Sequence, residues 1–489
     1  MTEIDFLIVG SGFGGLGMAI EISRYELGSF LILEKSDQLG GTWRDNTYPG
    51  AACDVKATLY HFSFAPWTWS RAYPQQDEIL TYMKKVASDF GVASHIRYNA
   101  EVVAATWDDS SQHWVVSCVD GSVYACRYLI GATGQLNRPR IPHFDGATEF
   151  LGAQFHTARF DHTVSLQDAR VAIIGSGASA IQVVPAVAER VRTLDIYQRS
   201  APYVMPKDDP PTTSRARFLQ RYFPWLTLWS RLRSYAFGEL FGAGLVGKKS
   251  VRAKARQQWE MYVGAVVRDP SLRDVIEPDY EIGCKRVLLA SDWYATLQQD
   301  HVTVVTTGID RFSPTGVVAK DGTERTYDVV IYATGFSATD FLAPISIVGR
   351  DGRTLRDVWG PRPLAHRGVS VPGFPNFFIL YGPNTNLGSN SILFMLESQI
   401  FYIRQLVTAT RDLGWSAIEV TEGAQEEWRA SIDNASRQTA WLQGCQSWYT
   451  VDGVNTNNWP FSSWRYHRLL RSADLENYQS VDPVSGTAA

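Results

Sequence analysis

Two glycine-rich loops constrain the fold of this chain more than any other feature. The first, Gly10-Ser-Gly-Phe-Gly-Gly15, directly follows the apolar run Asp5–Val9 and precedes a helical pattern that continues through Ile22. The second, Gly175-Ser-Gly-Ala-Ser-Ala180, follows the apolar run Arg170–Ile174 in the same way. A strand, a tight glycine turn and a helix N-terminus, in that order, bind the pyrophosphate of a dinucleotide. The sequence therefore predicts an α/β protein with two Rossmann-like dinucleotide-binding domains.

The residues after each loop indicate which dinucleotide binds there. The strand after the first loop ends at Glu34, where a carboxylate suits ribose hydroxyls, and the following Gly-Gly-Thr-Trp segment at 40–43 resembles the flavin-contacting loop of flavoproteins with two dinucleotide domains. After the second loop, Arg199 stands where a cation suits the 2′-phosphate of NADP and an acid would suit NAD. The alternative is that Arg199 is an ordinary surface arginine. The predicted contacts are Gly10, Gly12, Phe13, Gly15, Glu34, Gly41, Thr42 and Trp43 for FAD, and Gly175, Gly177, Ala178, Ser179, Ala180 and Arg199 for NADPH.

The order of the motifs predicts that the NADPH domain is inserted into the FAD domain. An Ala-Thr-Gly turn follows a strand pattern at 132–134 and again at 333–335, so the whole arrangement is duplicated. Between Pro210 and Pro278 the pattern becomes helix-like and rich in aromatic and basic residues, which predicts a helical insertion. The predicted boundaries are 1–141 and 332–479 for the FAD domain, 150–208 and 279–331 for the NADPH domain, 209–278 for the helical insertion, and 480–489 for a disordered tail.

Charge and cysteine content narrow the class of protein. With 46 basic and 50 acidic residues the net charge is −4, so no overall field favours nucleic acid. The five cysteines include no C-x-x-C pair and the histidines have no metal-ligand spacing, so we expect a reducing compartment and no metal site. We expect a cytoplasmic protein, because no signal peptide or membrane-spanning apolar run is present. Within the insertion, the apolar run 237–246 favours packing against its own domain, with membrane contact or a substrate tunnel as alternatives.

The segment between the two loops carries a family resemblance. Phe150-x-Gly152-x-x-x-His156-x-x-x-Phe160-Asp161 resembles the fingerprint of the class B flavoprotein monooxygenases. In Baeyer–Villiger monooxygenases that pattern ends in Trp followed by Pro or Asp, and in the N- and S-oxidising flavin-containing monooxygenases it ends in Phe or Tyr followed by Lys or Arg. This chain matches the first form at Asp161 and the second at Phe160. By resemblance His156 couples the two domains, and the alternative is a hydrogen-bonded structural histidine.

Two residues outside the fingerprint favour the Baeyer–Villiger subclass. Asp54, in Ala-Ala-Cys-Asp, and Arg286, in Gly-Cys-Lys-Arg, are similar to the acid and the arginine that this family sets beside the flavin. The resemblance implies that NADPH reduces FAD, that O₂ adds to give a C4a-peroxyflavin, and that Arg286 stabilises this peroxide while it attacks a ketone to give an ester or lactone. A guanidinium suits that role because it is permanently charged, and a carboxylate compensates its buried charge. The alternative is that Asp54 and Arg286 are distant, ordinary salt-bridge residues.

The same resemblance adds further cofactor contacts and leaves alternatives open. It implies that Lys285 contacts the NADP phosphate and that Trp448 lies on a mobile loop and meets the nicotinamide cofactor, with a core aromatic as the alternative for Trp448. Tyr60 and Val102 are expected near FAD by position. The predicted function is an FAD- and NADPH-dependent Baeyer–Villiger monooxygenase that acts on a small-molecule ketone with O₂. The alternatives are an N- or S-monooxygenase and a pyridine-nucleotide reductase, although Cys53 has no nearby cysteine for a disulfide-reducing version.

Overall fold

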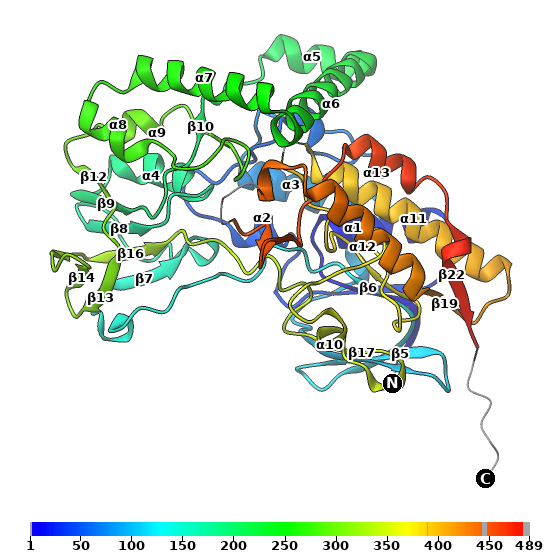
Figure 1. The fold of residues 1–489 in the computed structure, drawn as a ribbon. Helices are drawn as coiled ribbons and strands as arrows, with labels where there is room; N and C mark the ends of the chain where they lie inside the picture. Colours follow the sequence, from blue (N-terminus) through cyan, green and yellow to red (C-terminus); the bar gives the residue numbers. More distant parts are fainter. Residues whose placement is uncertain (1, 389, 443–446, 483–489) are drawn as a thin grey trace.

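Two α/β units lie side by side, with a layer of helices along one edge of the molecule (Figure 1). The computed structural model describes residues 2–388, 390–442 and 447–482. Each glycine-rich loop lies at the start of one unit, after its first buried strand. The predicted fold class, two Rossmann-like domains with a helical insertion, is confirmed.

The first unit is built on an eight-stranded sheet with a parallel centre. Strand β1 (Thr2–Val9) is fully buried at Phe6, Leu7 and Ile8, and it pairs in parallel with β2 on one side and β6 on the other. Helices α1 and α11 pack on each other against this sheet and form the largest core. The other elements of this sheet and its cover are β2 (Phe30–Leu33), β3 (Ile96–Arg97), β4 (Val102–Asp108), β5 (His113–Cys118), β6 (Val123–Gly131), β17 (Ser346–Val348), β18 (Phe377–Ile379), α1 (Phe13–Arg24), α3 (Gln76–Asp89) and α11 (Ile392–Asp412).

The second unit has a five-stranded, wholly parallel sheet in the order β12-β9-β8-β16-β7. Its strands are apolar because helices and loops cover both faces, as parallel sheets require. Strand β16 includes Tyr332, one residue beyond the boundary predicted at 331. The elements are β7 (Ala153–His156), β8 (Arg170–Ile174), β9 (Thr193–Tyr197), β12 (Val302–Val305), β16 (Val329–Tyr332), α4 (Ala180–Ala188), α9 (Trp293–Thr296) and the antiparallel β13 (Ile309–Ser313), β14 (Gly316–Ala319) and β15 (Glu324–Thr326).

Four helices lie between the short paired strands β10 (Val204–Met205) and β11 (Leu288–Leu289). Helix α6 also contacts the 3₁₀ turn η1 (Ala57–Leu59) of the first unit, so the insertion bridges the two units. Packing, the favoured interpretation of 237–246, holds at buried Leu245 but is wrong for Phe237 and Leu240, whose side chains are exposed. In the described part of the chain no helix is long and apolar enough to cross a membrane. The four helices are α5 (Ser214–Tyr222), α6 (Pro224–Gly247), α7 (Lys249–Val266) and α8 (Pro270–Ile276).

The prediction of a disordered tail from residue 480 onward is wrong at its start. Strand β22 (Tyr478–Val481) pairs antiparallel with β19 (Ala417–Val420), and the Val481 side chain is buried. The polar composition of the last ten residues hid this strand, whose ends Tyr478 and Val481 pack into the core. Residues 483–489 lie outside the described residues. The other helices and strands of the C-terminal part are α10 (Leu355–Trp359), α12 (Glu422–Ser436), α13 (Ser463–Leu469), β20 (Thr450–Val451) and β21 (Val454–Asn455). The short helix α2 (Thr42–Asp45) belongs to the N-terminal part of the first unit.

Candidate active site

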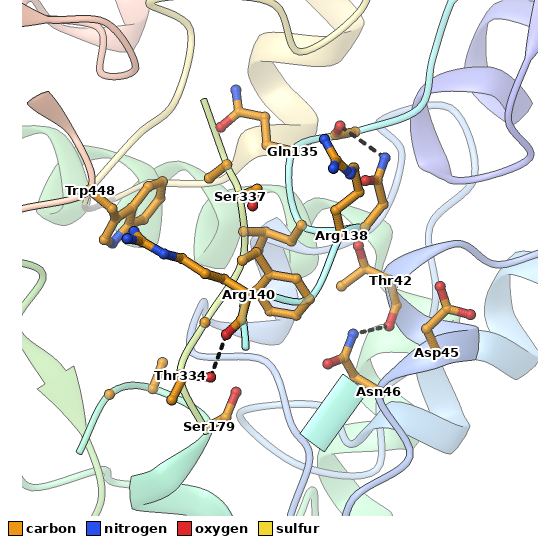
Figure 2. Close-up of a pocket in the computed structure, with 18 of the residues that line it drawn as sticks. Thr42, Asp45, Asn46, Gln135, Arg138, Arg140, Ser179, Thr334, Ser337 and Trp448 are labelled. Atoms are coloured by element: carbon orange, nitrogen blue, oxygen red, sulfur yellow. Dashed lines mark hydrogen bonds between the residues drawn. The ribbon is translucent and has the colours of Figure 1, made fainter. Parts of the chain in front are cut away.

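Both glycine-rich loops open into one cavity between the two α/β units, with a volume of about 1830 Å³. Pockets for a single small molecule are typically about 300–1,000 Å³, so this cavity has room for more than one ligand. Every predicted contact residue lines it except Gly15 and Ala180. Figure 2 shows that side chains from both units, among them Thr42 and Ser179, surround the same space. The structure therefore brings together residues that the sequence places far apart.

The two loops are built in the same way, and each leans on an Ala-Thr-Gly turn. Gly10 has φ +104°, and a Cβ there would lie 2.7 Å from the carbonyl oxygen of Ala132. Gly175 has φ +118°, and its Cβ would lie 2.4 Å from the carbonyl oxygen of Ala333. Only glycine tolerates this backbone conformation and contact. The backbone of each loop therefore packs directly against the end of a neighbouring strand. The helix that follows each loop has its N-terminus at the cavity.

Gly15 and Ala180 do not line the cavity but pack behind the two loops. A Cβ on Gly15 would lie 1.9 Å from the carbonyl oxygen of Gly10, so this glycine lets α1 pack against the loop. Ala180 is fully buried at the start of α4. The Cβ positions of Gly12 and Gly177, in contrast, meet no atom within 4 Å, and both residues line the cavity. This arrangement fits a pyrophosphate at each loop, because open glycine backbone allows the closest approach of phosphate oxygens.

Glu34 is held at the end of β2 by a network of donors. Its carboxylate accepts hydrogen bonds from the backbone N–H of Ser11 at 3.0 Å, from the Ser11 hydroxyl at 2.6 Å and from Arg44 at 2.8 Å. Burial works to raise the pKa of Glu34, but the Ser11 hydrogen bonds and the Arg44 charge outweigh it and lower the pKa below its ordinary value. The side chain is therefore an ionised acceptor next to the first loop. Sequence reasoning missed Arg44, although it directly follows the Gly-Gly-Thr-Trp segment.

The predicted flavin-side contacts Trp43 and Tyr60 meet across the cavity wall. The Trp43 indole N–H donates to the Tyr60 hydroxyl at 2.9 Å, and the two rings lie edge to face. Gly41 has φ +52° and precedes α2, so the chain turns sharply between Glu34 and Trp43. Val102 lines the same part of the molecule from the start of β4. An apolar wall with few polar groups is typical of a site that holds a large planar ring system.

Two cations lie together beyond the end of β9. The Lys285 ammonium donates to the Ser200 hydroxyl at 2.8 Å and sits 4.3 Å above the Tyr280 ring centroid. Burial lowers the pKa of Lys285, Asp279 opposes that change, and the charge of Arg199 adds to it. Arg199 itself is exposed at the cavity. Two mutually repelling cations favour a dianionic phosphate between them, which is the group that distinguishes NADP from NAD.

Arg286 and Asp54 form an ion pair inside the cavity. The Arg286 Nε donates to the Asp54 Oδ2 at 2.8 Å, and its Nη1 donates to the carbonyl oxygen of Leu387 at 3.2 Å. The Asp54 carboxylate raises the pKa of Arg286 further above its already high ordinary value. The side chains remain 24% and 30% exposed, so the pair still faces the open space. The Arg286 guanidinium is thus a permanent positive charge at the cavity, and Asp54 and the Leu387 carbonyl hold it in a fixed orientation.

The fingerprint segment is part of the second unit rather than a free linker. Its centre forms the edge strand β7, and Phe150 packs against Phe312 in the core. Gly152 is required there, because a Cβ would lie 2.4 Å from the Phe150 ring. Asp161 accepts a hydrogen bond from the backbone N–H of Thr163 and ends the segment in a turn. The fingerprint spacing therefore reflects how this strand packs.

His156 connects the fingerprint to the second Ala-Thr-Gly turn. Its ring is buried, lies 5.6 Å from the Phe336 ring, and accepts a hydrogen bond at Nδ1 from the backbone N–H of Ala158 at 3.0 Å. Burial lowers the pKa of His156 to about 4, so the imidazole is neutral at physiological pH. Beyond it, the His162 ring and the Thr47 hydroxyl are 2.9 Å apart and join this segment to the first unit. These contacts belong to a structural residue that also touches a cavity-lining loop.

Trp448 is 43% exposed at the cavity and packs on Tyr449, with ring centroids 4.6 Å apart. In Figure 2 the side chain of Arg140 extends toward it. Arg140 also joins the two Ala-Thr-Gly turns, since its N–H donates to the Gly335 carbonyl at 2.9 Å and its carbonyl accepts from the Thr334 hydroxyl. Sequence reasoning missed Arg140, although it closely follows the first of these turns. The other cavity residues that it missed include Gln135, Asn137, Arg138, Tyr381 and Asn386.

The fold and the duplicated loops define a two-dinucleotide flavoprotein oxidoreductase. In agreement, the family model of the pyridine nucleotide-disulphide oxidoreductases matches residues 7–222. Within the matched residues, Cys53 is a free, buried thiol, and burial raises its pKa. It therefore does not form the redox disulfide of a disulfide reductase. The match therefore establishes the nucleotide-binding architecture and leaves the reaction to closer relatives.

Those relatives identify the family. The chain is 39% identical over 486 residues to a Baeyer–Villiger monooxygenase of Streptomyces coelicolor, covering 99% of this chain and 93% of the relative. It is 37% identical over 475 residues to one of Pseudomonas aeruginosa, covering 96% and 90%. The chain belongs to the Baeyer–Villiger monooxygenase family and is an NADPH-dependent flavoprotein monooxygenase with FAD and NADPH as its cofactors.

Solved structures agree with this assignment. Oxidized steroid monooxygenase bound to NADP superposes with a TM-score of 0.88 at 28% identity, covering 98% of this chain and 99% of the other. Cyclohexanone monooxygenase from Rhodococcus sp. Phi1 bound to NADP⁺ gives a TM-score of 0.89 at 26% identity, with the same coverage. The family prediction made from the fingerprint, Asp54 and Arg286 is confirmed.

Proposed function

We propose that this enzyme inserts one oxygen atom of O₂ next to the carbonyl group of a small-molecule ketone and releases an ester or lactone. The observation that carries the proposal is the Asp54–Arg286 ion pair, which faces the cavity shared by both glycine-rich loops. NADPH is the hydride donor, and bound FAD supplies the chemistry that accepts the hydride and activates O₂. The protein's own contribution is to hold both cofactors and to stabilise the charge that develops on oxygen.

The binding residues divide between the two loops. Gly10 and Gly12 cradle the FAD pyrophosphate, Glu34 accepts from its ribose hydroxyls, and Trp43 with Tyr60 lines the flavin side. At the second loop, Gly175 and Gly177 have the same task for NADPH. Support comes from the two φ angles above +100° and from the open Cβ positions of Gly12 and Gly177. Arg199 and Lys285 bind the 2′-phosphate, and Trp448 covers the nicotinamide cofactor.

Arg286 stabilises negative charge on oxygen. Its guanidinium is charged at every physiological pH, so an anionic oxygen nucleophile and the oxyanion of the attacked carbonyl are both favoured beside it. Asp54 is a positioning residue, because its carboxylate holds the guanidinium at 2.8 Å and leaves other N–H groups for the reacting atoms. This polarity suits nucleophilic attack on a carbonyl better than oxygen transfer to sulfur or nitrogen, which needs a protonated, electrophilic donor.

Phe160, the fingerprint residue that points to N- or S-oxidation, has no contact with the cavity. Its ring packs on Phe155 at 5.0 Å and on His162 at 5.0 Å. Among the described residues, those that line the cavity do not include Phe160. Its identity therefore affects how the second unit packs rather than the reacting atoms, and we retain the ketone reaction as the proposal.

A product screen tests this function directly. The FAD-loaded enzyme is incubated with NADPH and ¹⁸O₂ together with matched ketone, thioether and amine panels, and the products are measured by mass spectrometry. We expect esters or lactones that contain one labelled oxygen. Labelled sulfoxides or N-oxides without any ester would contradict the proposal, and so would NADPH oxidation that yields no labelled product with any panel.

A further inference from the structure

Helix α6 presents an apolar face to solvent at the edge of the molecule. Figure 1 shows α5 and α6 at the top of the molecule, between α7 on one side and α13 on the other. The exposed fractions are 57% for Trp225, 67% for Trp229, 67% for Phe237 and 78% for Leu240. Leu228 and Leu232 are also exposed and complete what we term the α6 outer face. A concentration of exposed apolar side chains on one helix is typical of an interaction site, because leaving them in water costs free energy.

Three polar side chains of α6, those of Arg231, Ser234 and Glu239, point the other way, into the protein. Ser234 accepts a hydrogen bond from Thr58 at 3.2 Å, and Arg231 donates to the His61 carbonyl at 3.3 Å. Glu239 accepts from Asn390 at 3.0 Å and also bonds Ser463. An ordinary surface helix has the opposite arrangement, with apolar residues inward. The outward orientation of the apolar side chains is therefore a property of the whole helix and does not depend on one or two residues.

The charge around this face is strongly positive. Residues 214–247, which form α5 and α6, contain five arginines and one glutamate, Glu239, and that glutamate is bonded inward. Arg215, Arg217 and Arg233 are exposed beside the apolar side chains, and Phe218 and Tyr222 extend the aromatic surface along α5. Arg231 points inward toward Glu397, so the exposed positive charge beside this face lies on Arg215, Arg217 and Arg233, in a chain whose net charge is −4.

We propose that the α6 outer face docks on a lipid surface that carries anionic headgroups. Trp, Phe and Leu side chains on one face with flanking arginines are the composition of helices that lie in the plane of a membrane interface. The 24 residues of α6 give a helix of about 36 Å. Since no described helix can cross a membrane, α6 lies on the lipid and does not span it. On its inward side the same helix contacts η1, which directly precedes the cavity-lining Tyr60. The proposal does not depend on the reaction.

Vesicle flotation with the FAD-loaded enzyme tests this surface. We expect the protein to float with vesicles that contain about one-third phosphatidylglycerol in phosphatidylcholine, and to float several-fold less with phosphatidylcholine alone or in high salt, because salt screens the arginine contribution. The variant Trp229→Ser/Phe237→Ser should lower the bound fraction about tenfold, and Arg217→Ala/Arg233→Ala should remove the preference for anionic lipid.

The matched control is Val119→Ser/Leu413→Ser, which removes two similarly exposed apolar side chains on other elements and should float like the wild type. Retained FAD absorbance shows that each variant is folded. Wild-type protein that stays in solution with anionic vesicles would overturn the proposal. So would equal flotation of the wild type and Trp229→Ser/Phe237→Ser. A wild-type dimer in light scattering that this variant converts to monomer, without vesicle binding, would instead identify the face as a contact between two copies of the chain.

Discussion

Arg286 and Asp54 show how a few residues define the site. Asp54 precedes the second α/β unit in the sequence and Arg286 lies within that unit, yet Nε and Oδ2 are 2.8 Å apart in the cavity. Arg199 and Lys285 form a second cluster, in which the Lys285 ammonium donates to the Ser200 hydroxyl at 2.8 Å. Each cluster carries a separate function in the proposal, stabilisation of oxygen charge and recognition of the 2′-phosphate. The two functions therefore respond separately to substitution.

Removing the charge at Arg286 should stop oxygenation while hydride transfer survives. In Arg286→Ala we expect ester formation to fall by about 100-fold or more, the usual effect of losing one donor that stabilises a developing oxyanion. Anaerobic reduction of FAD by NADPH should continue, since the proposed NADPH contacts Arg199 and Lys285 are unchanged. Stopped-flow absorbance measures the reduction, and product analysis measures oxygenation. Arg286→Lys is the control that retains the charge but loses the two-sided contact with Asp54 and Leu387. Near-normal ester formation by Arg286→Ala would show that Arg286 does not stabilise the charge on oxygen.

Removing Arg199 should change nucleotide preference. We expect the KM for NADPH to rise by about 10- to 100-fold in Arg199→Ala, because a hydrogen bond between charged groups contributes roughly 1.5–3 kcal/mol. The KM for NADH should stay nearly constant, since NADH has no 2′-phosphate. Arg190→Ala, another exposed arginine of the same unit, serves as the control in steady-state kinetics. An equal loss for both nucleotides would show that Arg199 does not bind the phosphate.

At the scale of elements, the contact between α1 and its loop decides whether the first unit can hold a dinucleotide. Gly15 allows the helix to approach the Gly10 carbonyl, at a distance that leaves no space for a side chain. Gly14, one residue earlier, faces Leu380 at an ordinary 3.5 Å from its Cβ position. Two adjacent glycines on the same helix therefore have different structural importance.

Gly15→Ala should destabilise the first unit and weaken FAD binding. A Cβ 1.9 Å from backbone oxygen forces α1 away from the loop, and the strain of such overpacking costs about 1–3 kcal/mol or more. The FAD content of the purified protein and its thermal midpoint report the effect. Gly14→Ala adds the same methyl group in open contact distance, so it should retain FAD and unfold at nearly the wild-type temperature. The same loss of FAD in both variants would contradict this explanation.

At the scale of the whole molecule, the buried His156 ring of the second unit packs against Phe336, and burial favours its neutral form. Its pKa lies near 4, below the ordinary value of about 6.5, because burial opposes the charged form. As pH falls below about 6.5, the unfolded chain gains a proton that the folded chain excludes. The stability contributed by neutral His156 is therefore complete above that pH and declines toward pH 4.

Replacing His156 should reduce the sensitivity of stability to acid. Between about pH 7.5 and pH 5.5, titration of this one group removes roughly 1.4 kcal/mol from the wild type. His156→Gln should be less stable at neutral pH, yet should lose less of its remaining stability across this interval. Urea unfolding followed by flavin fluorescence at the two pH values measures the difference. An unchanged pH dependence in His156→Gln would show that another group titrates.

Local patterns predicted the fold, and all of the predicted cofactor contacts except Gly15 and Ala180 line the shared cavity. The positions of Gly10, Gly175 and Glu34 followed from a strand, a turn and a helix adjacent in sequence, and those rules act over a few residues. The position of Arg140 at the cavity was not predicted, because its contact with Gly335 joins two turns that only the packed units bring together. Strand β22 was not predicted either, because its partner β19 is distant in sequence and because the composition of β22 and the residues after it is that of a tail. The predictions failed where pairing between distant segments decides the outcome.

The sequence by itself determined two dinucleotide loops, the order of the two units and the residue types of the site. Those properties depend on steric limits and side-chain chemistry that neighbouring residues impose on one another. Only the tertiary structure decided that Asp54 pairs with Arg286 in one shared cavity, and that the apolar side chains of α6 face outward. An apolar pattern says which residues avoid water, but whether anything covers them depends on how the sheets and helices pack around them.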